Sequence, residues 1–286
     1  MSGTSKGDGA KPRSSAKKPS PTGIAAIDSL AAAAPCTIDD YIKGVSAYVR
    51  EQSKLGSGAK KASQIRLSNA LARALAHEIE RRLPKLAGRL VTDEQKVAGG
   101  LRTANADVSE SHRLDGLRLA VELKPINLAI GRAIWNRFGD LRTFAVNLHL
   151  KFPFAVVGGV LVIPTYEETG TRAAREAERY EANGEKDQDD VHAKADEPAN
   201  DQRDEGRAPA RKPTVHLVQR AIERLVRAGG RRSEADAAHL LEGIAVVVYD
   251  PETSTIHPDI PEAGSGLRWE EFVEDLVSSY RARFED

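Results

Sequence analysis

The sequence predicts an α/β protein in which helices flank a mixed central β-sheet. Two unbroken apolar runs, at residues 155–163 and 244–249, are typical of strands buried on both faces. Two further strand patterns, at 104–110 and 117–124, flank Asp115-Gly116, which is a strong hairpin signal. Helical periodicity separates these strand patterns, and this alternation favours the α/β class.

The composition limits the classes of protein to consider. The 286 residues are 40% hydrophobic and 29% charged, with a mean hydropathy of -0.44. No run approaches the ~18–20 apolar residues of a membrane span, and the first residues lack the apolar segment of a secretory signal. A single cysteine, Cys36, excludes an internal disulfide framework and a Cys-rich zinc module. We therefore expect a cytoplasmic protein that makes no membrane contact.

Charge is segregated along the chain although the formal net charge is zero. Residues 50–151 hold 19 Lys or Arg against 10 Asp or Glu, whereas residues 167–212 hold 9 against 14. A basic folded part offset by an acidic segment is typical of a protein that binds a polyanion. A solvated surface explains the same counts equally well.

The first part of the chain predicts an arm followed by helices. Residues 1–22 are rich in Ser, Gly, Pro and Lys, so we expect a disordered basic arm. Residues 23–62 are expected to hold N-terminal helices, one ending before Pro35 and one beginning after Thr37 as its N-cap. The Gly, Ser and Lys residues at 56–61 favour a linker.

Residues 63–165 are predicted to form the core of the domain. Residues 166–213 are charged and low in complexity, which indicates an insertion. Residues 214–286 would complete the core sheet, because a sheet that ended at residue 163 would be thin. A separate C-terminal module is the alternative. The expected elements are a helix at 63–83, a bend at Gly99-Gly100, strands at 104–110 and 117–124, a helix at 130–148, a strand at 155–163, a helix at 215–227, a strand at 244–249 and a helix at 269–284.

An acid and an amine lie two residues apart at the end of the second hairpin strand. Glu122 and Lys124 therefore point to the same face of that strand. In a hairpin whose paired residue numbers sum to about 229, Asp107 lies opposite Glu122. Asp115 gives a more compact motif, but it lies roughly 23 Å from Glu122 along an extended strand. We therefore favour Asp107 as the partner and assign Asp115 to the turn.

This set of side chains suits hydrolysis of a phosphodiester. Two carboxylates with retained waters are a ligand set that Mg²⁺ accepts. Lys124 beside them would orient the attacking water and offset charge in the transition state. Glu78 falls on the apolar stripe of the preceding helix, so it either contacts the metal through water or lies at the edge of the stripe in solvent.

The order of elements over residues 63–163 resembles the PD-(D/E)XK nuclease superfamily, which includes the type II restriction endonucleases. It consists of a helix, a bend, a strand with Asp107, a hairpin, a strand that ends in Glu122 and Lys124, a helix and an apolar strand. The resemblance implies a Mg²⁺-dependent endonuclease for double-stranded DNA, with Asp107 and Glu122 as metal ligands and Lys124 as the catalytic lysine. The chain has Ala106 where the family commonly has Pro, so Asp115 stays the alternative acid.

The helix at 130–148 offers candidate contacts to DNA. Arg132, Asn136 and Arg137 are side-chain types that bind phosphates or base edges, although the same residues could simply face water. Aromatic residues on the helix at 269–284 are expected to pack in the core. The alternative is a homodimer interface, which would suit cleavage of both DNA strands.

The expected function is that of a restriction-type, Mg²⁺-dependent endodeoxyribonuclease. Two alternatives remain open from the sequence. One is a DNA repair or phage-related nuclease of the same fold. The other is a non-catalytic DNA-binding protein that retains the fold with a decayed site.

Overall fold

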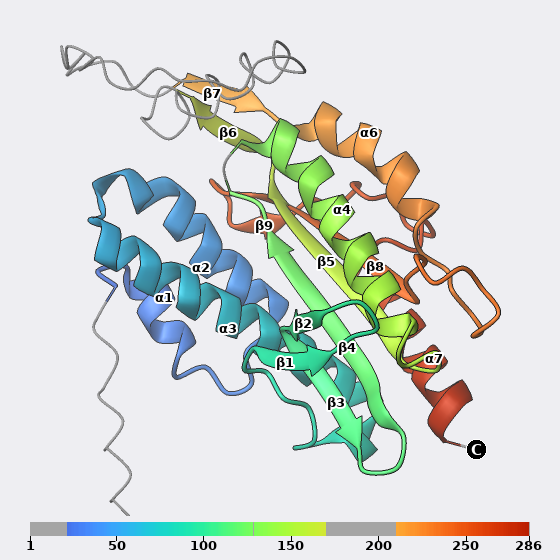
Figure 1. Ribbon diagram of the computed structural model, residues 1–286. Coiled ribbons are helices and arrows are strands. Elements are labelled where there is room, and N and C mark those ends of the chain that lie inside the picture. Colours follow the sequence, from blue (N-terminus) through green and yellow to red (C-terminus); the bar gives the residue numbers. More distant parts are fainter. Residues whose placement is uncertain (1–21, 128, 170–209, 286) are drawn as a thin grey trace, which may run out of the picture.

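A curled, five-stranded mixed sheet forms the centre of the protein (Figure 1). The computed structural model describes residues 22–127, 129–169 and 210–285. The strand order is β3-β4-β5-β8-β9; β4, β5 and β8 are parallel, and β3 and β9 are antiparallel to their neighbours. This arrangement confirms the predicted α/β class. The strands are β3 (Val108–His112), β4 (Gly116–Pro125), β5 (Val156–Pro164), β8 (Gly243–Asp250) and β9 (Thr255–Ile256).

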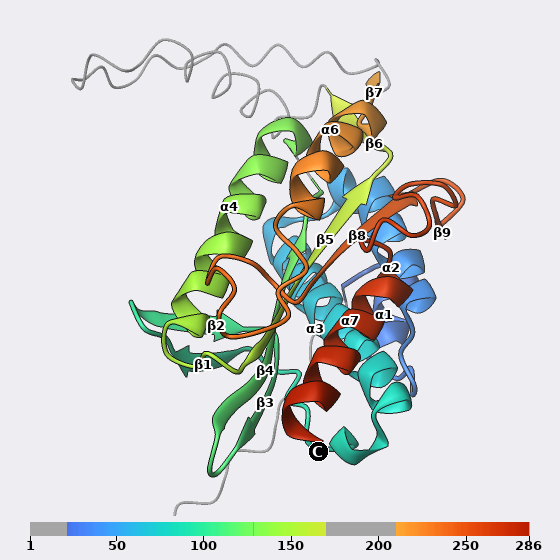
Figure 2. The same ribbon diagram turned by 90° about the vertical axis from the view of Figure 1, so that its right-hand side faces the viewer.

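Helices cover both faces of the sheet, as Figures 1 and 2 show. On one face, three N-terminal helices and the final helix share a hydrophobic cluster with the sheet. On the other face, two helices share a second cluster. The first group is α1 (Ala25–Leu30), α2 (Ile38–Glu51), α3 (Ser57–Arg82) and α7 (Trp269–Phe284); the second is α4 (Ile130–His149) and α6 (Val215–Val226); short 3₁₀ turns are Gln52–Lys54 and Pro84–Leu86.

Side chains of β4 alternate between these two faces. Leu119, Val121 and Leu123 belong to the cluster beneath α1–α3 and α7, while Ala120 belongs to the cluster beneath α4 and α6. This two-residue period is the ordinary pleat of a strand. The even-numbered positions that follow, including Glu122, therefore lie on the face that α4 covers.

The strand predicted at 104–110 is in fact two strands. β1 (Gln95–Ala98) and β2 (Thr103–Ala106) pair antiparallel as a separate two-stranded sheet, and β3 begins at Val108. Asp107 is the single residue between β2 and β3. The expected bend at Gly99-Gly100 is the connection between β1 and β2. The sequence did not reveal the division because it depends on pairing with β1, which is a tertiary contact.

The prediction of a linker at 56–61 is wrong. α3 begins at Ser57, so these residues form its first turns and the expected boundary at residue 62 falls inside the helix. Gly and Ser in this stretch favour a loop, but Ala59 and Lys60 are good helix formers and extend the helix toward its N-terminus.

The strand expected after the acidic segment lies in the same sheet as the core strands. β8 pairs parallel with β5, for example through Val160 and Ala245. Before and after the acidic segment, β6 (Tyr166–Thr169) and β7 (Ala210–Pro213) pair antiparallel. The predictions for the arm at 1–22 and the insertion at 166–213 otherwise fall on residues 1–21 and 170–209, outside the described part.

The aromatic residues of α7 pack in the core of the protein. Trp269, Phe272 and Tyr280 are buried in the cluster shared with α1–α3. The core interpretation of these aromatic residues is therefore confirmed, and the three residues are not exposed for a dimer contact. A homodimer built on another surface stays a prediction.

Within the described residues, no helix combines the length and the apolar composition that a transmembrane helix needs.

A buried charged network joins the C-terminal part of the chain to α4. The carboxylate of Glu242 is fully buried and pairs with Arg231 at 2.9 Å and Arg283 at 2.8 Å. His149 Nε2 lies 3.3 Å from the same carboxylate, and the backbone amide of Val157 donates to it at 2.8 Å. The buried His149 ring thus lies beside the ion pairs of Glu242.

Thr37 caps α2 as the sequence predicted. Its side chain accepts a hydrogen bond from the Asp40 amide at 3.2 Å, and the Asp40 carboxylate accepts one from the Thr37 amide at 3.1 Å. We expect Thr37→Ala to lower the free energy of unfolding by about 1 kcal/mol, because the first turn loses a partner for its amide. Urea denaturation measures the change. Ser57→Ala is the control, since this exposed residue of α3 has no hydrogen bond to its side chain among the described residues; an equal loss in both variants would contradict the capping role.

Candidate active site

Asp107 and Glu122 are brought together by the register of the β3–β4 hairpin. Val108 pairs with Val121 and Ser109 with Ala120, so the residue numbers sum to 229 as expected. Asp107 lies one residue before this ladder begins, and its amide donates a hydrogen bond to the Val121 carbonyl at 3.0 Å, so it lies at the end of the ladder beside Glu122. The Leu123 amide donates a hydrogen bond to Asp107 Oδ2 at 2.6 Å, which fixes the carboxylate beside β4. A bulge between Glu110 and Ser111 shifts the register only nearer the turn.

Glu122 and Lys124 share a face of β4 and form an ion pair. Lys124 Nζ lies 2.5 Å from Glu122 Oε1, and both side chains are largely buried. The other carboxylate oxygen, Glu122 Oε2, is buried and has no hydrogen-bond partner among the described residues. A buried carboxylate oxygen without a donor is costly. It therefore marks a position where a cation would be favourable.

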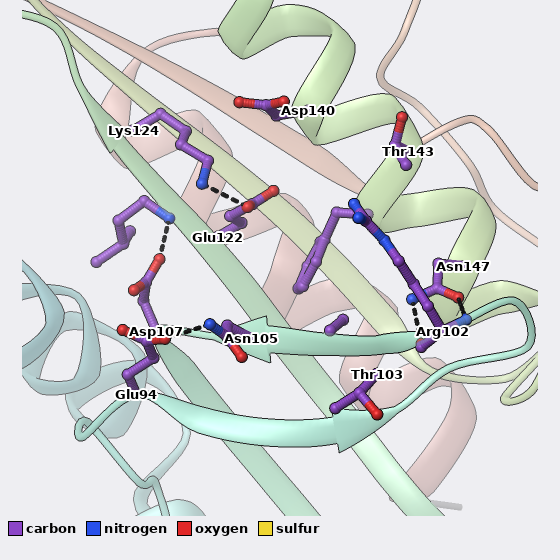
Figure 3. Close-up of a pocket in the computed structure, with 13 residues that line it drawn as sticks. Glu94, Arg102, Thr103, Asn105, Asp107, Glu122, Lys124, Asp140, Thr143 and Asn147 are labelled. Atoms are coloured by element: carbon purple, nitrogen blue, oxygen red, sulfur yellow. Dashed lines mark hydrogen bonds and ion pairs between the residues drawn. The ribbon is translucent and has the colours of Figure 1, made fainter.

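The three side chains line a polar cavity of about 390 Å³ between β4, the β1–β2 ribbon and α4 (Figure 3). Lys124 and Glu122 face α4 in this view, and Asp107 lies below them on the side of Glu94. Four acids and two bases contribute to the lining. The charged and polar lining residues are Glu94, Arg102, Thr103, Asn105, Asp107, Glu122, Lys124, Asp140, Thr143 and Asn147.

Burial and charge repulsion shift the two central carboxylates in the same direction. Burial raises the pKa of Glu122; the neighbouring Lys124 opposes this shift, whereas the charges of Asp107 and Asp140 add to it. Burial likewise raises the pKa of Asp107; the Leu123 amide and Lys124 oppose the shift, and Glu94 adds to it. Paired acids with raised pKa values in a cavity are typical of functional sites.

Asp115 lies in the hairpin turn, away from the cavity. Its carboxylate pairs with Arg118, with a distance of 2.7 Å from Nε to Oδ2, and with His112 Nδ1 at 3.3 Å. It is not among the residues that line the cavity. The turn assignment of Asp115 is therefore confirmed, and the geometry favours Asp107 as the acid beside Glu122.

Glu78 also lies outside the cavity lining. Its carboxylate pairs with Arg81 at 3.0 Å and with Arg82 at 3.9 Å on the same helix. This agrees with a residue at the edge of the apolar stripe of α3. The sequence-based role for Glu78 as a water-mediated metal contact gains no support from this position.

Arg132, Asn136 and Arg137 are exposed on α4, near the cavity but not in its lining. Arg137 pairs with Asp140 at 2.9 Å. Asp140 itself lines the cavity, one helical turn after Asn136. The three residues predicted to bind DNA thus lie on the part of α4 that leads away from the cavity toward the N-terminus of the helix.

Sequence reasoning missed several residues that the cavity includes. Glu94, Arg102, Asp140 and Asn147 all line it. A signal was present for Asp140 and Asn147, because they continue at helical spacing the stripe that contains Asn136. Glu94 and Arg102 lie beside short strands of a separate ribbon, and no periodicity points to them.

Asp107 and Glu122 fit a divalent cation that keeps most of its waters. Within the described residues, no three Asp, Glu, His or Cys side chains gather into a preformed metal site. Mg²⁺ commonly takes only one or two carboxylates, together with waters and substrate phosphates. The unpartnered Glu122 Oε2 and the nearby Asp107 carboxylate meet that smaller requirement.

No family model, curated protein or solved structure matches this chain. The resemblance to PD-(D/E)XK nucleases therefore stays a prediction from the sequence motif.

We expect Mg²⁺ to raise the thermal stability of the protein at slightly alkaline pH. Because the fold raises the pKa of Asp107 and Glu122, their ionised forms weaken the folded state as pH rises through those values. A bound cation relieves that repulsion, and ten times its Kd would add about 1.4 kcal/mol. The gain should shrink as pH falls through the raised pKa values, where protons replace the cation. Melting curves at constant ionic strength measure it.

Asp107→Asn is the matched control for this measurement. Its amide oxygen can still accept the Leu123 hydrogen bond, so the local fold is retained while the charge is lost. A Mg²⁺-dependent shift of equal size in this variant would place the cation elsewhere.

Proposed function

We propose that the protein is a Mg²⁺-dependent endodeoxyribonuclease that cleaves phosphodiester bonds of double-stranded DNA, of the restriction type. One observation supports this most strongly. Asp107, Glu122 and Lys124 converge in one polar cavity, where Glu122 retains a buried carboxylate oxygen without a partner among the described residues. Two acids and an amine in this arrangement suit metal-assisted hydrolysis of a phosphodiester.

In this proposal Asp107 and Glu122 hold the cation. A bound Mg²⁺ would neutralise charge on the phosphate and lower the pKa of a bound water. The Leu123 amide keeps the Asp107 carboxylate oriented, because it occupies one oxygen at 2.6 Å. Because the pKa values of both acids are raised, binding of the cation should strengthen as pH rises through those values and weaken as pH falls through them.

Lys124 acts on the water and on the phosphate in this proposal. Its ammonium pairs with Glu122 at 2.5 Å, so it stays beside the proposed cation site and does not swing into solvent. From there it would orient the attacking water and offset the negative charge that grows on the phosphorus-bound oxygens. Its buried stem and its carboxylate partner fix its position before substrate binds.

The exposed face of α4 supports DNA as the substrate. Arg132, Asn136, Asp140 and Thr143 follow one another at steps of four, four and three residues, so they form one stripe. Asp140 and Thr143 line the cavity, and Arg132 and Asn136 extend the stripe outward. Arginine and asparagine along such a stripe suit contacts to the phosphate backbone and to base edges.

Incubation of the purified protein with long, unmodified duplex DNA tests the proposal. Cleavage in Mg²⁺ and none in a chelator is the expected result, and discrete fragments would identify a restriction-type enzyme. A smear, or nicks confined to branched or damaged DNA, would favour the repair or phage-related nuclease. DNA binding without cleavage would favour the non-catalytic protein and contradict the proposal.

A further inference from the structure

The turn between β1 and β2 is fastened to α4 by one buried side chain. Asn147 Oδ1 accepts hydrogen bonds from the amides of Leu101 at 2.8 Å and Arg102 at 3.0 Å. Its Nδ2 donates to the Arg102 carbonyl at 2.8 Å. The Gly100 amide adds a bond to the Asn147 carbonyl at 2.7 Å. Asn147 is only 2% exposed, so its side chain makes these hydrogen bonds inside the protein and not at the surface.

The two glycines of this turn allow the close approach. A Cβ atom on Gly99 would lie 2.3 Å from the Asn147 side chain, and one on Gly100 would lie 2.6 Å from Leu150 Cβ. Both distances are well inside van der Waals contact. Glycine is therefore required here for packing against α4, as it is wherever a backbone approaches another element closely.

The β1–β2 ribbon needs these contacts with α4, because a two-stranded sheet is marginally stable on its own. The β1–β2 ribbon is separate from the central sheet, and it carries Glu94, Arg102 and Asn105 to the cavity. A buried asparagine is favourable only when its polar atoms are satisfied. Here the turn backbone satisfies them, so the position of Arg102 is set by Asn147.

Arg102 extends from the turn along α4 toward Thr143, beside the cavity (Figure 3). Its guanidinium forms no ion pair with any residue in the described part of the chain. The other cavity base, Lys124, is already paired with Glu122. Four acids would repel a phosphate, so a second cation without a carboxylate partner has a clear electrostatic use.

We propose that Arg102 binds the non-bridging oxygens of the substrate phosphodiester, and that Asn147 is the residue that positions it. This inference rests on the proposed nuclease function. A guanidinium presents two parallel N–H donors to a phosphate, which gives both charge and geometry. The competing interpretation is that Arg102 only balances the acids of the cavity, in which case it would not contact DNA.

The test compares Arg102→Ala and Arg102→Lys with Arg113→Ala, an exposed arginine in the distant β3–β4 turn. We expect Arg102→Ala to reduce kcat by about 10²-fold, with partial recovery in Arg102→Lys. In the absence of Mg²⁺, binding of a labelled duplex oligonucleotide is measured at increasing KCl concentration. Loss of one phosphate contact should reduce the slope of log Kd against log salt by about 0.9. Arg113→Ala should match the wild type in both measurements.

A double-mutant cycle tests the role of Asn147. If Asn147 acts through Arg102, the loss of kcat in Asn147→Ala disappears when Arg102 is already alanine. A purely structural asparagine would give losses that multiply. Should Asn147→Ala fail to fold, Gly100→Ala takes its place, because it crowds the same turn against Leu150.

The outcomes separate this inference from the proposed function. A wild-type protein that neither binds nor cleaves DNA contradicts both. A wild-type protein that cleaves DNA, with Arg102→Ala unchanged in kcat and in salt slope, overturns only the role of Arg102. Losses that multiply in the cycle overturn only the positioning role of Asn147.

Discussion

Glu122→Gln will reduce Mg²⁺-dependent cleavage of duplex DNA by about 10³-fold or more, while the protein stays folded. The substitution keeps the shape of the side chain but removes its charge, so the proposed cation site loses one of two carboxylates. It also separates Lys124 from its ion-pair partner. Single-turnover cleavage, with circular dichroism as the check on folding, measures the effect.

Lys124→Ala should give a loss of similar order by a different route. It leaves both carboxylates in place, so the Mg²⁺-dependent gain in melting temperature should persist while cleavage is lost. Asp115→Asn is the matched control, because Asp115 belongs to the turn and is 41% exposed beside Arg118. Full activity in Glu122→Gln, or a loss in Asp115→Asn as large as in Glu122→Gln, would show that the site has been assigned to the wrong acids.

The largest effect on stability is expected at Glu242. Glu242→Ala should lower the free energy of unfolding by about 3–5 kcal/mol, because it leaves buried positive charges without their partner. The side chain of Arg231 is 1% exposed and that of Arg283 9%, so water can replace little of the lost carboxylate. The Val157 amide also loses its acceptor. Urea denaturation with a two-state fit measures the change.

Glu274→Gln is the control for this prediction. Glu274 pairs with Arg82, but its side chain is 60% exposed, so the expected loss is below about 1 kcal/mol. Equal losses of unfolding free energy in the two variants would mean that the buried Glu242 network stabilises the fold no more than an exposed ion pair does.

The contribution of Glu242 should also depend on pH. Burial alone would raise the pKa of Glu242, but His149, Arg283 and the Val157 amide together hold it below the usual value. Stability from this group is therefore present above the ordinary carboxyl pKa and is lost as pH falls through the lower, folded value. The difference between wild type and Glu242→Gln should shrink over that acidic range.

The expected position of Asp107 beside Glu122 combines a local pattern with a feature that no pattern showed. A hairpin centred on Leu114 and Asp115 gives paired residue numbers that sum to 229, which places Asp107 opposite Glu122. In the structure the pairs next to the turn sum to 228, and the bulge at Glu110/Ser111, which was not foreseen, shifts the sum to 229 on the side of the site. Alternation on β4 then placed Glu122 and Lys124 on one face.

The remaining walls of the cavity depend on contacts that no local pattern records. Arg102 and Glu94 reach the site because the β1–β2 ribbon leaves the central sheet at Asp107 and turns against α4. That path is set by Asn147, which is distant in sequence from the turn it holds. The wrong prediction at residues 56–61 has a similar origin. This Gly/Ser-rich stretch forms the first turns of α3, whose later turns are buried in the core, and that packing is not visible in the local sequence.

The buried position of α7 has a consequence for biosynthesis. Every wall of the cavity belongs to residues 94–147, which leave the ribosome before β8 and α7 are made. The central sheet nevertheless needs β8 as a parallel partner of β5, and α7 packs on α3, β5 and β8. A nascent chain therefore contains the site residues before it contains the scaffold that fixes them. The proposed cleavage of DNA would therefore require a chain that has been translated through α7.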